Sequence, residues 1–324
     1  MVALGDTVVD AFIKLKEAHV TCKIDNTECE ICMKFADKIP YESVEVINGV
    51  GNSANAAVSA ARLGLHTALI TNLGDDSYAK DVLEYFKKEK VSTEFVKENK
   101  GKKTNYHYVL WYGAERTILI KHEDYEYTFP KNLKTNWLYL SSLGEKSLPL
   151  HSEIANYLSE NTETKLVFQP GTYQIRFGKE ALQEIYKRTE IFFCNKEEAA
   201  KILGVADTNI PSLMKQIAEL GPKIVVLTDG PNGAYALRDG KTFFAPPYPD
   251  PKPPFERTGA GDAYASTFAS AIAKGKSTEE ALLWAGVNSM SVVQDVGAQK
   301  GLLSEEKIQE WLQKAPESYK VKEI

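Results

Sequence analysis

The chain has 324 residues, 43% of them hydrophobic, which is enough for one large α/β domain or two smaller ones. Acidic side chains (44) outnumber basic ones (39), the net charge is −5 and no basic stretch is sustained, so we expect no nucleic-acid partner. No apolar run approaches the ~18 residues of a membrane span, no signal peptide is evident, and the 4 cysteines do not make a disulfide scaffold. These features predict a cytoplasmic protein with reduced thiols and no membrane partner.

The first predicted strand covers residues 2–10 and becomes polar toward its end. Val2–Leu4 are apolar. Gly5 follows, and residues 6–9, which mix polar and apolar side chains, lead to Asp10. Acids at the carboxyl end of a strand lie where open α/β sheets bind ligands, so Asp10 is a candidate ligand of a substrate. The alternative is an exposed acid at the end of a strand.

Residues 11–47 are too polar and too irregular for a helical crossover between parallel strands. This segment holds two pairs with a metal-like spacing, His19 with Cys22 and Cys29 with Cys32. Four nitrogen and sulfur ligands would suit a structural zinc ion. Cysteine is also an ordinary buried side chain, and reduced core or interface cysteines are the favoured interpretation.

A helix is predicted after a glycine-rich turn at residues 48–51. Positions 54, 57, 58 and 61 are apolar and share one helical face, and Gly64 ends the helix. Asn52 and Asn55, near the start of this helix, are either helix caps or ligands of a substrate.

The next predicted elements are a strand, a helix, a short strand and a β-hairpin, at residues 67–73, 77–90, 92–96, 102–111 and 117–121. The hairpin carries Tyr106, Tyr108 and Tyr112. We expect these rings to face a cleft beneath the hairpin, whether they pack against each other or stack on a ligand.

Strands and helices then alternate regularly, which predicts a parallel sheet with helices on both faces. The predicted strands cover 137–140, 165–168 and 191–194, and the helices cover 149–159 and 179–188. Asn195 and Glu198 follow the last of these strands with the spacing of a capping box. A buried strand at 224–228 leads into a turn bounded by Gly230 and Gly233.

The most distinctive stretch runs from Glu256 to Asp262 and opens a helix rich in small residues. Gly259 and Gly261 leave backbone amides uncovered at the helix N-terminus, an arrangement that suits a phosphate or a developing anion. Asp262 is either a favourable charge on the helix dipole or a general base for a hydroxyl that attacks a phosphoryl group. A further helix is predicted at 278–294, on which Asn288 is either a contact for adenine or a plain surface residue.

The string Thr-Gly-Ala-Gly-Asp-Ala at 258–263 resembles the C-terminal signature of the ribokinase-like (PfkB) carbohydrate and nucleoside kinases. Gly51, Asn52 and Asn55 resemble the N-terminal signature of that family, although Val50 stands where it usually has a glycine. The resemblance implies a doubly wound, mostly parallel α/β sheet flanked by helices. It further implies a single domain over residues 1–324, with a small β-sheet lid at about 12–47 and 100–128.

The implied reaction is ATP-dependent phosphorylation of an alcohol group on a sugar. By resemblance, Asp262 is the general base, and Gly259, Ala260 and Gly261 cradle the transferring phosphoryl group. The residues that match the substrate site are Asp10, Gly51, Asn52 and Asn55. Those that match the nucleotide site are Asn195, Thr228, Gly230, Gly233 and Asn288.

The resemblance implies Mg²⁺ organised by Glu198 through water. Glu256 and Thr258 match the positions that lie at the ion site in relatives activated by K⁺. Because the family usually has Asp at the position of Glu256, activation by K⁺ is an open alternative. The alternatives are a nucleoside kinase of the same family and a non-catalytic sugar-binding regulator. A homodimer formed through the lid is also expected from the resemblance.

Overall fold

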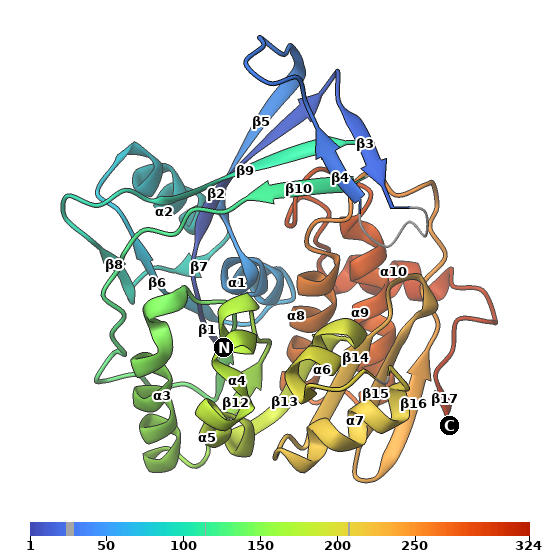
Figure 1. Cartoon of the computed structure of the whole chain (residues 1–324). Helices are drawn as coiled ribbons and strands as arrows, with labels where there is room; N and C mark the ends of the chain where they lie inside the picture. The colour runs from blue at the N-terminus through green and yellow to red at the C-terminus, as the bar shows by residue number, and fades with distance from the viewer. Residues whose placement is uncertain (24–28, 114, 207) are drawn as a thin grey trace.

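The computed structural model describes residues 1–23, 29–113, 115–206 and 208–324. A large sheet with helices on both faces forms the body, and a smaller sheet stands over one end of it (Figure 1). Across these ranges, no helix is both long and apolar enough to cross a membrane.

The large sheet runs in the order β17-β16-β15-β14-β13-β12-β11-β1-β6-β7, with β8 also paired to β6. Pairing is parallel from β7 through to β14 and antiparallel over β15, β16 and β17. The strands are β1 (Val2–Leu4), β6 (Thr67–Leu73), β7 (Val91–Ser92), β8 (Val96–Glu98), β11 (Trp137–Leu140), β12 (Lys165–Phe168), β13 (Thr189–Asn195), β14 (Ile224–Thr228), β15 (Ala234–Arg238), β16 (Lys241–Ala245) and β17 (Lys322–Glu323). The mostly parallel sheet is therefore confirmed.

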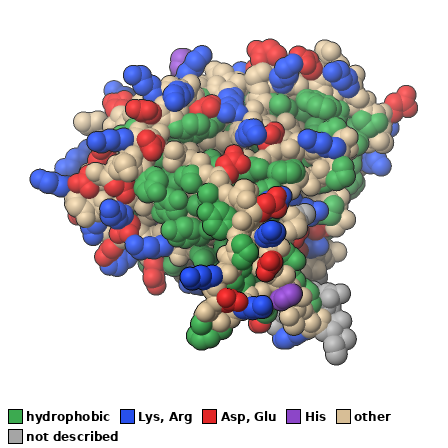
Figure 2. Space-filling view, turned by 90° about the horizontal axis from the view of Figure 1, so that it is seen from above, with side chains coloured by type: hydrophobic (Ala, Val, Ile, Leu, Met, Phe, Trp, Pro, Cys, Tyr) green, Lys and Arg blue, Asp and Glu red, His purple; other side chains and the backbone are tan. Residues whose placement is uncertain are grey.

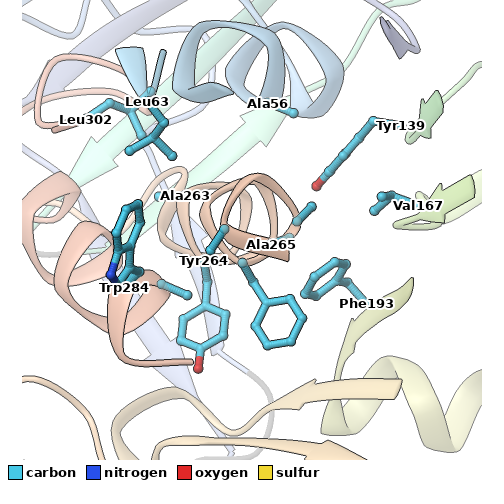
Figure 3. Close-up of a cluster of buried hydrophobic side chains, with 14 of the residues drawn as sticks. Ala56, Leu63, Tyr139, Val167, Phe193, Ala263, Tyr264, Ala265, Trp284 and Leu302 are labelled. Atoms are coloured by element: carbon cyan, nitrogen blue, oxygen red, sulfur yellow. The ribbon is translucent and has the colours of Figure 1, made fainter. Parts of the chain in front are cut away.

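Helices bury both faces of this sheet, which is why its central strands are continuous apolar runs. Val225 and Val226 are both fully buried, yet they belong to different hydrophobic clusters because successive side chains point to opposite faces. One face is covered by α1 (Asn52–Arg62), α2 (Ser77–Lys88), α8 (Ala260–Ala273), α9 (Thr278–Val292) and α10 (Glu305–Gln313). The other is covered by α3 (Leu148–Glu160), α4 (Thr172–Ala181), α5 (Gln183–Arg188), α6 (Lys196–Leu203) and α7 (Ile210–Glu219). Figure 3 shows α8 at the centre of the first cluster.

The small sheet is the lid. It consists of β10 (Glu115–Leu119), β9 (Asn105–Tyr112), β2 (Val8–Leu15) and β5 (Tyr41–Val50), in that order. The prediction of one strand from residue 2 to residue 10 is wrong. The strand β1 ends at Leu4, the chain crosses to the lid, and Asp10 lies within β2. Gly5 stands at this crossing, where a Cβ would come 2.8 Å from Oγ of Ser141. The crossing explains why apolar and polar residues both occur after Gly5.

Two further predicted elements are divided in the structure. The strand predicted at 92–96 is interrupted by a turn in which the Val96 N–H donates to Thr93 O, so β7 and β8 pair with β6 separately. The helix predicted at 179–188 is divided between α4 and α5 at Leu182, whose φ of −107° and ψ of 16° leave the helical path, and Gly178, with a φ of 84°, breaks α4 just before the predicted start.

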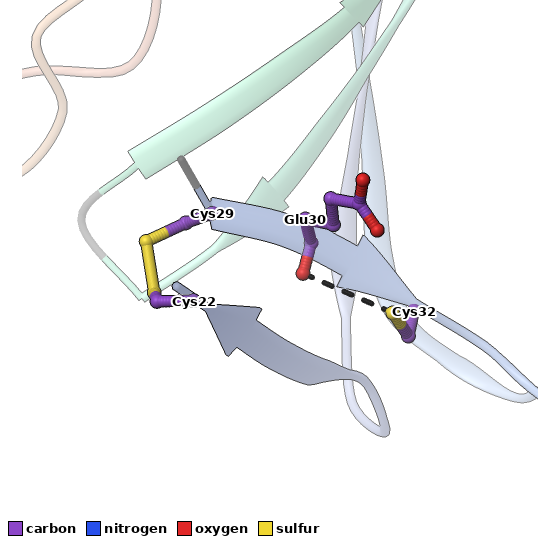
Figure 4. Close-up of a disulfide and its surroundings, with 4 residues drawn as sticks. All are labelled: Cys22, Cys29, Glu30 and Cys32. Carbon is purple, nitrogen blue, oxygen red and sulfur yellow. Dashed lines mark hydrogen bonds between the residues drawn. A yellow bond between two sulfur atoms is a disulfide. The ribbon is translucent and has the colours of Figure 1, made fainter. Parts of the chain in front are cut away.

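A separate hairpin of β3 (His19–Cys22) and β4 (Cys29–Cys32) projects from the lid. Cys22 and Cys29 form a disulfide across it, and Cys32 is a free, exposed thiol whose Sγ faces Glu30 O (Figure 4). The disulfide takes two of the four ligands predicted for zinc, so that hypothesis is wrong. The expectation of reduced thiols is wrong for the same two residues.

Candidate active site

Two cavities meet at the N-terminus of α8. The first, of about 410 Å³, lies beneath the lid and is walled by residues of β2, β9, β10, α1 and α8. The second, of about 240 Å³, is bounded by the turn at 230–233, the proline-rich segment after β16, and α9. Thr228, Arg257 and Gly261 line both cavities. A molecule in one cavity can therefore reach a molecule in the other across the start of α8.

The turn before α8 depends on glycine. Gly259 has a φ of +79°, and a Cβ there would collide with Ala298, so the backbone at this point approaches the 298 loop closely. At Gly261 a Cβ would meet no atom within 4 Å, so this side of the helix start is open to the cavities. The first amides of α8 have no acceptor within the helix. Ala260 N donates to Arg257 O at 3.5 Å, while Gly261 and Asp262 line the first cavity, so this helix N-terminus is suited to an anion.

Asp262 lies in the first turn of α8 and accepts hydrogen bonds from three side-chain amides. Asn52 Nδ2 donates to Oδ1 at 2.7 Å, Gln169 Nε2 donates to Oδ1 at 3.0 Å, and Asn55 Nδ2 donates to Oδ2 at 2.7 Å. A carboxylate offers about four acceptor sites. Among the described residues, Oδ1 accepts two of these hydrogen bonds and Oδ2 accepts one, so Oδ2 can accept one more, and Asp262 lines the first cavity.

Further hydrogen bonds fix the direction of these amides. Tyr139 OH donates to Gln169 Oε1 at 2.6 Å, which turns the Gln169 NH₂ group toward Asp262. Gln299 Nε2 donates to Asn55 Oδ1 at 2.8 Å and does the same for Asn55. Burial raises the pKa of Asp262, and the three amides oppose that rise because they stabilise the charged form.

The lid side of the first cavity holds two pairs of acid and histidine. His107 Nδ1 lies 3.5 Å from Asp10 Oδ1, and His122 Nδ1 lies 3.0 Å from Asp6 Oδ2. Tyr127 OH donates to both oxygens of Asp6 at 3.0 Å. Burial raises the pKa of Asp10 to about 7, and burial together with His122 lowers the pKa of His107 to about 4. His107 is therefore neutral at neutral pH, and its contact with Asp10 is not an ion pair.

A family model described as "pfkB family carbohydrate kinase" matches residues 29–305. The chain belongs to this family. It is 25% identical over 289 residues to a 5-dehydro-2-deoxygluconokinase of Clostridium perfringens (83% of this chain and 85% of the relative). It is also 25% identical over 286 residues to a ribokinase of Bacillus subtilis (86% and 92%).

The fold agrees with that membership. The crystal structure of Methanocaldococcus jannaschii nucleoside kinase, described as an archaeal member of the ribokinase family, superposes with a TM-score of 0.77 at 20% identity over 97% of both chains. The protein is accordingly an ATP-dependent carbohydrate kinase, an enzyme that transfers a phosphoryl group to an alcohol. Kinases of this family use ATP with a divalent metal.

In this PfkB kinase, Asn195 and Glu198 form the capping box predicted for them. Asn195 Oδ1 accepts from Glu198 N at 2.8 Å, and Glu198 Oε2 accepts from Asn195 N at 2.9 Å. Both residues also line the first cavity, at the carboxyl end of β13. Burial raises the pKa of Glu198, and the charge of Asp262 adds to that rise.

The second cavity contains most of the residues that resemble a nucleotide site, namely Thr228, Gly230 and Gly233. Asn288 is different, because it is fully buried between α8 and the segment before α10. Its Nδ2 donates to Thr267 Oγ1 at 2.7 Å, and its Oδ1 accepts from Leu303 N at 2.9 Å. The surface position predicted for Asn288 is wrong, because its side chain is buried and its polar atoms bond inside the core.

The lid tyrosines also differ from expectation. His107 lines the first cavity, so its neighbours Tyr106 and Tyr108 point to the other face of β9, where their rings lie 5.2 Å apart. Tyr106 also contacts Tyr78 of α2 at 5.0 Å. The prediction that the rings of Tyr106 and Tyr108 face the cleft is wrong, because the residue of β9 that faces it lies one position away, at His107.

Glu256 and Thr258 lie beneath the lid, beside the turn that opens α8. Glu256 is 1% exposed, and its Oε1 accepts from both the N–H and the hydroxyl of Thr258. Its Oε2 accepts from Gly297 N at 3.3 Å. Arg116 Nη1 of the lid lies 3.7 Å from Oε1.

Sequence reasoning missed several residues of the cavity, namely Asp6, His107, Arg116, His122, Gln169 and Arg257. A local signal existed for Arg257, which stands inside the glycine-rich motif, and for Gln169, which follows a predicted strand directly. The lid residues gave none, because strand pairing alone decides which of them face the cavity.

Proposed function

We propose that this kinase transfers the γ-phosphoryl group of ATP to a hydroxyl of an uncharged sugar, with Asp262 as the general base. The observation that carries the proposal is the position of Asp262, where the two cavities meet, with one acceptor site on Oδ2 that no described residue uses. A carboxylate that is held by amides and open on one side can accept the proton of an attacking hydroxyl.

In the proposed step, the substrate oxygen bonds to the γ-phosphorus of ATP while the bond from that phosphorus to the β–γ bridging oxygen breaks. ADP leaves, and the hydroxyl proton passes to Asp262 Oδ2. The amides of Ala260, Gly261 and Asp262 stabilise the negative charge on the transferring group, as fixed dipoles do in phosphoryl transfer. Gly259 supplies the turn that points these amides toward the cavities.

We further propose that Glu198 and Asn195 organise Mg²⁺. The donor set supports this, because hard divalent cations prefer oxygen ligands, and Glu198 uses only Oε2 in its capping bond among the contacts described. The ion would offset charge on the phosphates when bound. Thr228, Gly230 and Gly233 would border the nucleotide in the second cavity, and Arg257 reaches both cavities.

The far end of the first cavity supports a sugar as substrate. Asp10 Oδ1 and His107 Nε2 are buried polar atoms without a hydrogen-bond partner among the described residues, so substrate hydroxyls can satisfy them. Asn52, Asn55 and Gly51 would complete the substrate site on α1. Asp6 and Asp10 would repel a second phosphate or a carboxylate, which disfavours sugar phosphates.

A nucleoside kinase is the second candidate, because the solved nucleoside kinase shares the fold. Assays with ATP over pentoses, hexoses, nucleosides and sugar phosphates distinguish the two. The proposal expects the highest kcat/KM with an uncharged sugar, and a clear preference for a nucleoside or a sugar phosphate would overturn it.

The role of Asp262 is tested with Asp262→Asn, which keeps the shape of the side chain and removes the base. We expect kcat to fall by about 10²-fold or more, while ATP binding by isothermal titration stays near that of the parent. Turnover close to the parental value would remove Asp262 from the mechanism.

The outer face of the lid supports a homodimer as the working form. Val46, Ala11, Tyr108 and Leu119 are register partners across all four strands and point away from the cavity. Val46, Tyr108 and Leu119 are 46%, 49% and 52% exposed, and Figure 2 shows hydrophobic side chains gathered on the face of the molecule that carries the lid. Sedimentation should give a dimer for the parent and a monomer for Leu119→Lys, and a parental monomer would refute the idea.

A further inference from the structure

Arg116 of β10 carries a guanidinium from the lid into the first cavity, where it meets a buried acid. Its Nη1 lies 3.7 Å from Oε1 of Glu256, and the Glu256 side chain is 1% exposed. Burial raises the pKa of Asp10 and of Asp262, and the positive charge of Arg116 opposes that rise in both. Arg116 is thus close enough to influence three carboxylates at once.

Glu256 holds the turn that leads into α8. Its carboxylate accepts from the Thr258 N–H at 2.5 Å, from the Thr258 hydroxyl, and from Gly297 N at 3.3 Å. A buried carboxylate needs a positive partner, because its charge is not screened by water. Without one, Glu256 would also repel the anion that the amides after Gly259 attract.

Apolar contacts surround the ion pair and join the lid to the body of the protein. Trp111, the register partner of Arg116, packs against Phe255 with ring centroids 5.2 Å apart. Trp111 also belongs to a small buried cluster with Phe12, Val109 and Val296. Contact between Arg116 and Glu256 is therefore possible only while the lid is docked against residues 255–256.

The oxygens of Glu256 do not fit a monovalent cation in this arrangement. Oε1 accepts two hydrogen bonds and Oε2 accepts one, and the Arg116 guanidinium lies 3.7 Å from Oε1. We propose that Arg116 is the built-in cation of this site: it neutralises Glu256 when the lid docks, so that the turn before α8 is held without K⁺. The proposal rests on the proposed role of that turn in holding the phosphoryl group.

The test compares the parent with Arg116→Ala in KCl and in tetramethylammonium chloride at equal ionic strength. Parental kcat/KM should be the same in both salts. Arg116→Ala should lose activity in tetramethylammonium by about a hundredfold, the scale of losing one electrostatic contact in an active site, and should recover much of it in KCl. Lys121→Ala is the matched control, because it removes an exposed lid cation that pairs with Glu123.

A second readout needs no turnover, so it separates this proposal from the proposed function. KCl should raise the thermal unfolding midpoint of Arg116→Ala relative to tetramethylammonium chloride and leave the parent and Lys121→Ala unchanged. Activation of the parent by K⁺ would overturn the proposal. So would an Arg116→Ala variant whose activity K⁺ does not restore, since Arg116 would then act on the substrate or the phosphoryl group directly.

Discussion

Replacement of Asp10 by asparagine should stabilise the fold, and the gain should depend on pH. The side chain of Asp10 is 11% exposed, and burial raises its pKa from an ordinary 3.8 to about 7, with Arg116 lowering it and Glu256 raising it further. The unfolded chain therefore loses this proton at lower pH than the folded protein does. The stability that Asp10 contributes is therefore fully present below its pKa in the unfolded chain, and it is lost as the pH rises through its pKa in the folded protein.

The size of the effect follows from the two pKa values. One pKa unit corresponds to about 1.4 kcal/mol, so a rise from 3.8 to about 7 destabilises the ionised protein by up to about 4 kcal/mol. The amide side chain of the Asp10→Asn variant carries no charge and avoids this cost. The free energy of unfolding of Asp10→Asn should therefore exceed that of the parent by a margin that grows by about 3–4 kcal/mol between about pH 4 and pH 8.

Urea unfolding of both proteins across this pH range measures the margin directly. Asp239→Asn serves as the control, because Asp239 is an acid whose side chain is 86% exposed in the turn between β15 and β16. A margin for Asp10→Asn that stays flat with pH would refute the reasoning. The same variant should bind the sugar more weakly, since stability and function conflict at a buried charge.

Two further substitutions test the metal site and the turn. Glu198→Gln should raise the Mg²⁺ concentration needed for half-maximal activity and leave the thermal midpoint nearly unchanged, because the amide still accepts from Asn195 N; superimposable Mg²⁺ titrations would mean that the pair is only a helix cap. Gly259→Ala should lower the free energy of unfolding by about 1–3 kcal/mol more than Gly275→Ala does in urea titrations. Both glycines have a positive φ, +79° and +81°, but only at Gly259 would a Cβ meet Ala298, so equal losses would exclude that contact as the cause.

The body of the fold was predictable because its signals are local. Buried parallel strands such as 224–228 are continuous apolar runs. The glycine-rich turn at 259 predicts the start of α8 from neighbouring residues only. The two asparagines of α1 were identified for the same reason, since their spacing from the preceding glycine lies within one stretch of chain. The local sequence did not predict their contact with Asp262, which lies more than 200 residues away in the chain.

Other features depended on contacts that no local pattern records. His107 faces the cavity because β9 pairs with β2 in one register, and a shift of one residue would have turned Tyr106 toward the cavity in its place. Asn288 resembles a surface residue, but Thr267 and Leu303 satisfy its polar atoms inside the core. The disulfide joins Cys22 and Cys29 because the hairpin places them directly opposite each other.

The strength of Asp262 as a base should depend on a residue that never touches the substrate, Tyr139. Its hydroxyl orients Gln169, which donates one of the three hydrogen bonds to the carboxylate, and Figure 3 shows Tyr139 among the buried side chains around α8. In Tyr139→Phe the amide of Gln169 can rotate, and the charged form of Asp262 loses part of an interaction worth about 1.5–3 kcal/mol. Because burial already raises this pKa, the acidic limb of the kcat/KM profile should move up by about one pH unit.

Tyr186→Phe removes another buried hydroxyl, on the opposite face of the sheet, and should leave the profile in place. If the two profiles coincide and Tyr139→Phe loses only stability, then Tyr139 merely packs the core, and the hydrogen bond from Gln169 to Asp262 does not depend on its hydroxyl.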